Sequence, residues 1–241
     1  MLLTRPEVMP SCLFEETAFE ATRARLRAIA PDAPRVYAVA RVEEEPRRRW
    51  WSLACEGRGQ RVELLYRRVL DDVEDPRIAV EQVAGALIHV IIGRVLAPFV
   101  IEGRAWDPGL ENLWVHQDSD GGIDWAGVAD DTLRVLPGDP AAGGRDVVVV
   151  PCERALAVWT AHRAVSALSA VHETLQGCAP IDDARYWGLV GRTVVTGAAQ
   201  LPQLAESSRH TAARRGQHLL DAFAAAGFPV RGLAKLGQPS L

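Results

Sequence analysis

The most continuously apolar segment of the sequence, Ala79–Ile101, constrains the fold more than any other. It reads AVEQVAGALIHVIIGRVLAPFVI, which predicts a helix that is buried on most of its circumference. Its length approaches the ~20 residues of a membrane span, but His89 and Arg94 lie near its middle, where an arginine costs about 2.5–3.5 kcal/mol. Pro98 lacks the amide hydrogen that a helix interior needs. We therefore predict a buried helix of a soluble protein, kinked or ended early at Pro98.

One stripe of this helix places a histidine between two glycines. Gln82, Gly85, His89 and Gly93 are three or four residues apart, so at about 100° per residue they share one helix face. The glycines lie one turn before and one turn after the imidazole and carry no side chain. Two interpretations follow. Either the glycines admit a neighbouring helix and His89 is a hydrogen-bonded core residue, or they leave space for a ligand beside the imidazole.

The cysteines and the charge balance argue against several classes of protein. The four cysteines, Cys12, Cys55, Cys152 and Cys178, are far apart and form no C-x-x-C pair, as expected of a chain with no disulfide scaffold, zinc site or iron–sulfur cluster. The formal net charge of −4 gives no general attraction for nucleic acid or for an anionic membrane. The N-terminal MLLTRPEVMP lacks the apolar core of a signal peptide. We expect a cytoplasmic protein that binds neither nucleic acid nor membrane.

The residues before the central helix predict a small mixed region. An amphipathic helix is expected over residues 14–30, with acids in its first half and arginines in its second. Residues 35–42 and 50–55 have the pattern of strands, whereas residues 61–70 fit either a strand or a helix. Residues 1–75 are therefore expected to form an N-terminal helix and a small β meander.

A β-hairpin is predicted after the central helix. Residues 110–117 and 123–128 alternate apolar and polar positions on either side of DSDGG, whose aspartates and glycines favour a turn. The same segment fails as a calcium loop, because Gly122 stands at a ligand position and Ala129 where the closing glutamate is needed. TLRVLP supplies another candidate strand, and DVVVV predicts a short buried one.

The rest of the chain predicts helices. They are expected over residues 152–177, 184–204 and 206–227, the first and last closing on glycine. The predicted fold is therefore α+β and predominantly helical, with an N-terminal meander, a central buried helix, a β-hairpin and a C-terminal helical half. Residues 76–241 would form the main helical domain, packed with residues 1–75 as one compact unit.

No common catalytic motif is present. The sequence has no G-x-S-x-G elbow, phosphate-binding glycine loop or dinucleotide fingerprint, and HETLQ at 172–176 lacks the second histidine of a zinc protease. We expect no metal site and no cofactor. What remains is a set of cationic and aromatic side chains in apolar surroundings, which either line a small-molecule pocket or are paired structural groups: His89, Arg94, Trp114, His116, His162, Arg163, Trp187 and Arg192.

Several segments together resemble a known family. IIGRVLAPFV, LENLWVHQDSDGG, YWGLVGRTVV and GQHLLDAFAAAGFPVRG, which fall within residues 75–232, resemble the FhuF-type ferric-siderophore reductases, which are related to the C-terminal region of the IucA/IucC siderophore synthetases. That resemblance implies a [2Fe–2S] cluster held by closely spaced C-terminal cysteines. This chain has no cysteine after Cys178, so an electron-transferring reductase is not expected.

Two functional hypotheses follow. The first is a cofactor-independent tailoring enzyme of a secondary-metabolite or siderophore pathway, in which His89, His116 or His162 acts as acid or base. Arg94 or Arg192 would stabilise developing negative charge, and the ligand would also contact a further set of side chains: Trp114, Arg163 and Trp187. The alternative is a non-catalytic binding protein for a ferric siderophore or similar ligand, or a divergent siderophore iron reductase. A homodimer stays open as the oligomeric state.

Overall fold

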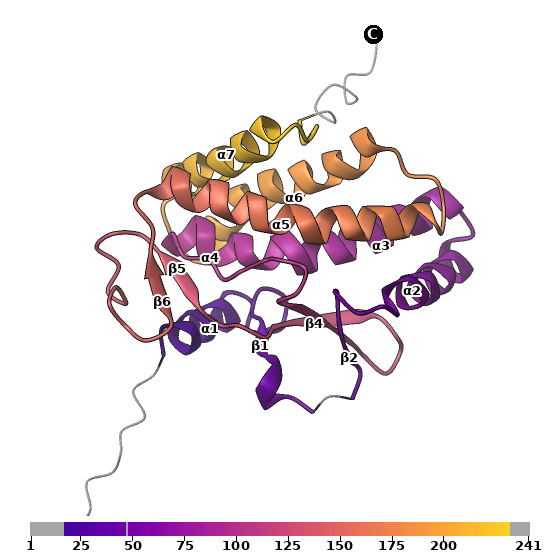
Figure 1. Cartoon of the computed structure of the whole chain (residues 1–241), viewed down its shortest axis with the longest axis horizontal. Coiled ribbons are helices and arrows are strands. Elements are labelled where there is room, and N and C mark those ends of the chain that lie inside the picture. Colours follow the sequence, from indigo (N-terminus) through magenta and orange to yellow (C-terminus); the bar gives the residue numbers. More distant parts are fainter. Residues whose placement is uncertain (1–16, 47, 232–241) are drawn as a thin grey trace, which may run out of the picture.

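A long buried helix runs through the centre of the protein (Figure 1). In the computed structural model, which describes residues 17–46 and 48–231, this helix consists of α3 (Pro76–Ile88), a π-helical turn η2 (His89–Gly93) and α4 (Arg94–Glu102). Asp75 caps its first turn by accepting hydrogen bonds from two backbone amides, and it ends at Gly103, which has a left-handed φ of 72°. The prediction of a central buried helix is confirmed.

Pro98 neither stops nor ends this helix early. It lies inside α4, which continues to Glu102. By length and composition alone, Pro76–Glu102 is also a helix that could cross a membrane, but 78% of its most apolar window is buried inside the protein. The core helix of a soluble protein has the same two properties.

Three helices form the layer that covers one side of the central helix (Figure 1). They are α5 (Glu153–Gln176), α6 (Asp183–Leu204) and α7 (Arg209–Ala225), close to the predicted ranges. Helices α6 and α7 approach each other at Gly216, where a Cβ would lie 2.6 Å from the Cβ of Ala198. The C-terminal helical half is therefore confirmed, and α6 is held between α7 and the central helix.

The main sheet differs from the predicted meander. Its strands are β1 (Ala40–Arg41), β2 (Trp50–Ser52), β3 (Leu113–Gln117) and β4 (Ile123–Val128), in the order β1-β4-β3-β2. The predicted hairpin β3–β4 is confirmed and supplies the two inner strands, whereas β1 runs parallel to β4 and β2 antiparallel to β3. The two N-terminal strands are too short to form a sheet alone, so each pairs with the hairpin instead.

Residues 61–70, which fit a strand or a helix, lie within helix α2 (Arg58–Val73). Helix α1 (Ala18–Ile29) covers most of the predicted range 14–30, of which residues 14–16 lie outside the described part. The strand predicted over residues 35–42 is reduced to β1, because residues 35–37 form turns and a 3-10 turn, η1 (Val42–Glu44), follows β1 directly. The N-terminal region is thus more helical than its sequence pattern indicated.

A second, two-stranded parallel sheet contains β5 (Leu133–Val135) and β6 (Val147–Val149). The prediction that DVVVV is buried is wrong, because Val148 and Val149 are 46% and 47% exposed. Strand β6 is an edge strand of this sheet, so much of its surface faces solvent.

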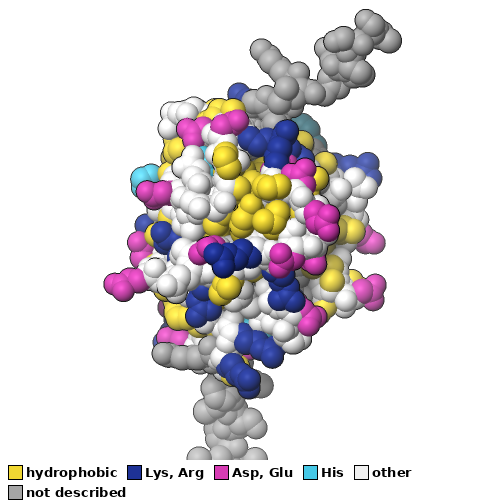
Figure 2. Space-filling model, turned by 90° about the vertical axis from the view of Figure 1, so that its right-hand side faces the viewer, with side chains coloured by type: hydrophobic (Ala, Val, Ile, Leu, Met, Phe, Trp, Pro, Cys, Tyr) yellow, Lys and Arg dark blue, Asp and Glu magenta, His cyan; other side chains and the backbone are white. Residues whose placement is uncertain are grey.

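On the face of the molecule in Figure 2, basic and acidic side chains surround a patch of hydrophobic side chains, and this face carries no continuous basic surface.

Candidate functional site

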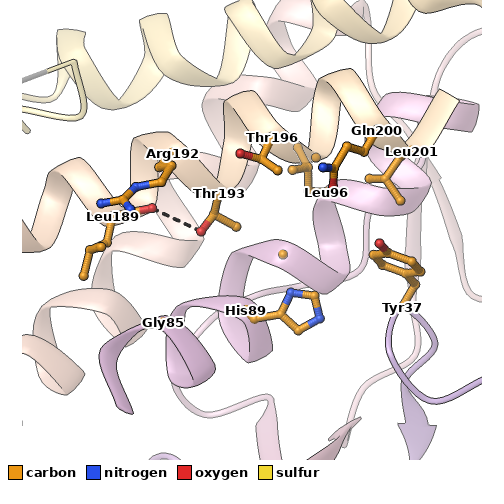
Figure 3. A pocket seen from close by; sticks show the side chains of 12 residues that line it. Tyr37, Gly85, His89, Leu96, Leu189, Arg192, Thr193, Thr196, Gln200 and Leu201 are labelled. Atoms are coloured by element: carbon orange, nitrogen blue, oxygen red, sulfur yellow. Dashed lines mark hydrogen bonds between the residues drawn. The ribbon is translucent and has the colours of Figure 1, made fainter. Parts of the chain in front are cut away.

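A pocket of about 380 Å³ lies between the central helix and α6 (Figure 3). This volume is near the lower end of the roughly 300–1,000 Å³ that small-molecule sites occupy. The segment before β1 contributes Tyr37 at one end. The two helices supply the other lining residues, which are Gly85, His89, Gly93 and Leu96 from the central helix, and Leu189, Arg192, Thr193, Thr196, Gly197, Gln200 and Leu201 from α6.

The two glycines beside His89 have different structural roles. A Cβ on Gly85 would meet no atom within 4 Å, so this glycine faces open space and does not admit a packed helix. A Cβ on Gly93 would overlap the His89 ring, at 3.0 Å from Cγ and 3.1 Å from Cε1 and closer still to Nδ1. Gly85 therefore belongs to the wall of the pocket, and Gly93 accommodates the imidazole.

His89 begins the π-helical turn, where the backbone amide of Arg94 donates to the His89 carbonyl five residues earlier. Such π-helical turns are rare in proteins, and those that occur are often found at functional sites. The imidazole Nε2 lies 2.8 Å from the carbonyl oxygen of Val36, which can only accept, so Nε2 carries the hydrogen. Burial, and then the charge of Arg94, lower the pKa of His89. The neutral ring is thus left with a free acceptor, Nδ1, on its Gly93 side.

Tyr37 was not a predicted site residue, yet it lies beside His89, with the ring centroids 6.1 Å apart in an edge-on arrangement. In Figure 3 its hydroxyl points toward α6. Burial raises the pKa of Tyr37, so the phenol keeps its proton at neutral pH. No sequence signal marked this residue, because it is brought to the pocket by a chain segment about fifty residues before His89.

Arg94 holds that segment against the central helix. The residue is 3% exposed, and its guanidinium donates to the carbonyl oxygens of Arg35 and Ala38, the latter at 2.8 Å. Burial lowers the pKa of Arg94 to about 10, and the charge of Asp124 partly offsets this. Arg94 does not line the pocket. Its contacts make it a positioning residue for the segment that carries Tyr37, and not the ligand contact that its sequence position suggested.

His116 and Trp114 lie on strand β3 and do not line the pocket. His116 Nδ1 is 2.6 Å from Asp124 Oδ1, and Arg35 forms an ion pair with the other carboxylate oxygen at 2.8 Å. Burial alone would raise the pKa of Asp124, but hydrogen bonds from His116 and Arg35 hold it below its usual value. Trp114 packs against a small apolar cluster on the same sheet. These residues form a sheet-surface cluster separate from His89.

Three other predicted residues, His162, Arg163 and Trp187, lie on α5 and α6. Arg163 pairs with Asp107 at 2.7 Å, which ties α5 to the loop before β3, whereas His162 is exposed. Trp187 is 4% exposed and packs on Phe228, with ring centroids 4.1 Å apart. None of the three lines the pocket. Of the eight side chains predicted from sequence, the structure brings two to this pocket, His89 and Arg192.

Arg192, Thr196 and Gln200 present polar atoms along the α6 side of the pocket (Figure 3). Among residues 17–46 and 48–231, no group of three or more His, Cys, Asp or Glu side chains is placed to hold a metal ion. The chemistry that this arrangement supports is proton transfer and hydrogen bonding by His89 and Tyr37. Comparison with protein-family models, with curated proteins and with solved structures finds no match to this chain.

Proposed function

We propose that the protein is a cofactor-independent acid–base enzyme that binds a small carbonyl compound in the pocket beside His89. The observation that carries this proposal is the neutral imidazole of His89, fixed through Nε2 by the Val36 carbonyl at 2.8 Å and free at Nδ1 on the side where Gly93 has no side chain. A histidine held in one tautomer by a backbone carbonyl is a general base with a defined direction.

The reaction class follows from the two groups at the pocket. Nδ1 of His89 takes a proton from the carbon next to the substrate carbonyl, and the Tyr37 hydroxyl donates a hydrogen bond to the oxygen on which negative charge develops. The proton is then returned to another position of the same molecule, so the step is an isomerisation without gain or loss of electrons. The lowered pKa of His89 keeps the base form populated at neutral pH, and the raised pKa of Tyr37 keeps the donor protonated.

We also propose that this activity belongs to secondary metabolism or a siderophore pathway, and the support for this is the resemblance of the sequence segments to siderophore-related proteins. The alternative function, binding without chemistry, has one supporting feature: Arg192 is exposed beside the pocket and suits an anionic ligand. The volume of about 380 Å³ favours a small molecule over an entire ferric siderophore.

Deuterium exchange tests the proposal directly. A panel of small ketones, oxo acids and acylated amines is incubated with the protein in D2O, and incorporation at the carbon next to the carbonyl is followed by NMR. Wild type should accelerate exchange of at least one compound about 100-fold or more over His89→Gln, whose amide replaces the hydrogen bond to Val36. Tyr37→Phe should also slow exchange.

The control is His210→Gln, because His210 is an exposed residue of α7 away from the pocket. It should exchange at the wild-type rate. Equal rates for wild type and His89→Gln with every compound would refute the enzymatic proposal. If a compound bound in the pocket without any exchange, the binding function would replace it.

A further inference from the structure

Three polar side chains of α6 form a stripe along the pocket. Arg192, Thr196 and Gln200 are spaced by four residues, so they lie on one face of the helix, and all three line the pocket. Within the described part of the chain, none of them takes part in an ion pair or side-chain hydrogen bond, and this distinguishes Arg192 from Arg185 on the same helix. Arg185 pairs with Glu81. The three side chains are exposed at the edge of the pocket, so their hydrogen-bonding groups are available to a ligand there.

The charge of the lining residues has one sign. Among the described residues that line the pocket, Arg192 is the one with a permanent charge and none is an aspartate or glutamate. The lowered pKa of His89 favours the neutral imidazole at neutral pH. An anionic group gains from the guanidinium without meeting a carboxylate, whereas a cationic group finds no partner. The rest of the wall is apolar or uncharged, with Gly85, Gly93 and Leu96 opposite α6.

The arrangement suits a carboxylate better than a phosphate. A single guanidinium can hold either a carboxylate or a phosphate with two parallel hydrogen bonds, and its one positive charge balances the single charge of a carboxylate in full. A phosphate dianion is usually held by a helix N-terminus or by several cations. Here α6 begins at Asp183, so Arg192 and the lining residues after it lie in the body of the helix, and residues 17–46 and 48–231 bring no second cation to the pocket.

We propose that the ligand of this pocket is a small, elongated carboxylic acid, with its carboxylate on Arg192 and its other polar group near Tyr37 and Gln200. Eight residues of helix separate Arg192 from Gln200, which is about 12 Å. The carbon chain between the two ends crosses Gly85 and Gly93, passing His89. This inference rests on the proposed function, since it names the substrate class of the same pocket: an acid that also carries a carbonyl group.

Four probes of equal chain length separate charge from shape: octanoate, octanamide, octylammonium and octyl phosphate, each titrated calorimetrically into the full-length protein. Octanoate should bind about 3- to 10-fold more tightly than octanamide, as expected for one charged hydrogen-bonded pair with an exposed arginine. Octylammonium should not bind, and octyl phosphate should bind no more tightly than octanoate. Equal affinity of octanoate and octanamide, or tighter binding of octyl phosphate, would overturn the assignment of a carboxylate.

Substitutions of Arg192 test whether this residue causes the preference for octanoate over octanamide. Arg192→Gln should abolish the difference between octanoate and octanamide, and Arg192→Lys should retain part of it because it keeps the charge without the planar fork. Arg209→Gln is the matched control, an exposed arginine of α7 that does not line this pocket, and it should keep the full preference. A preference that survives Arg192→Gln would refute the role of this residue.

Gly85→Leu separates this inference from the proposed function. The leucine projects into the open space beside Gly85 and should block every probe that occupies the pocket. If octanamide and octanoate bind equally and both are blocked, the pocket binds ligands but the carboxylate inference fails. If octanoate binding is unaffected by Gly85→Leu, both the inference and the assigned pocket are wrong. If no probe binds, an elongated acid is not the ligand, and the exchange assay still decides the proposed function.

Discussion

Replacing Gly93 by alanine perturbs the imidazole without adding any other group to the pocket. The new Cβ would overlap Nδ1 of His89 and lie 3.0 Å from its Cγ, so the ring must move. The ring is fixed by the hydrogen bond from Nε2 to the Val36 carbonyl, and moving it breaks that bond. An unsatisfied, part-buried acceptor such as the Val36 carbonyl costs about 1–3 kcal/mol.

The net effect is smaller, because alanine is better than glycine in a helix by about 0.5–1 kcal/mol. We therefore expect Gly93→Ala to lower the free energy of unfolding by about 0.5–2 kcal/mol. In a His89→Ala background the clash is absent, and the same substitution should raise the free energy of unfolding by about 0.5–1 kcal/mol. The coupling energy of the double-mutant cycle is then about 1–3 kcal/mol.

Urea unfolding of the four proteins at pH 7.5 measures this cycle. Gly85→Ala is the matched control, about two turns earlier on the same helix face, where a Cβ meets nothing within 4 Å. It should stabilise the protein by about 0.5–1 kcal/mol in both backgrounds. Equal destabilisation by Gly93→Ala with and without the imidazole would show that the His89 contact is not the reason for a glycine at this position.

Three further predictions concern the same region and its supports. Because the folded-state pKa of His89 is lowered, the unfolded state binds the proton more tightly, so wild type should lose stability relative to His89→Gln as the pH falls below about 6.5, measured by urea unfolding from pH 8 to 5. Arg94→Leu removes the guanidinium that donates to the carbonyl oxygens of Arg35 and Ala38, although the Trp125 indole still donates to Ala38, and it should cost about 1–3 kcal/mol, with loss of ligand binding in calorimetry. Arg163→Met removes the partner of Asp107 and should lower stability by about 1 kcal/mol, reduced by its exposure to solvent, while octanoate affinity stays unchanged.

Local patterns in the sequence are sufficient to predict most of the helices and the β-hairpin. The apolar run of the central helix, the turn-forming DSDGG and the periodic segments of α5, α6 and α7 each specify an element through residues that are close in the chain. The stripe of Gly85, His89 and Gly93 was also readable, because helix geometry alone puts these three residues on one face. The sequence could not decide whether that face meets another helix or a space.

The tertiary structure decided that question, and it also decided the hydrogen-bond partners of His89 and Arg94. The hydrogen bond from His89 reaches Val36 across 53 positions of the chain, and the bond from Arg94 to Ala38 spans 56. Contacts over such separations depend on how whole elements pack, and no local periodicity encodes them. Arg94 holds the segment that carries Tyr37, and β1 and β2 pair with the hairpin instead of each other. Both arrangements depend on contacts between residues that are far apart in the sequence. The residue types were present in the sequence, but packing alone determined which of them share the pocket.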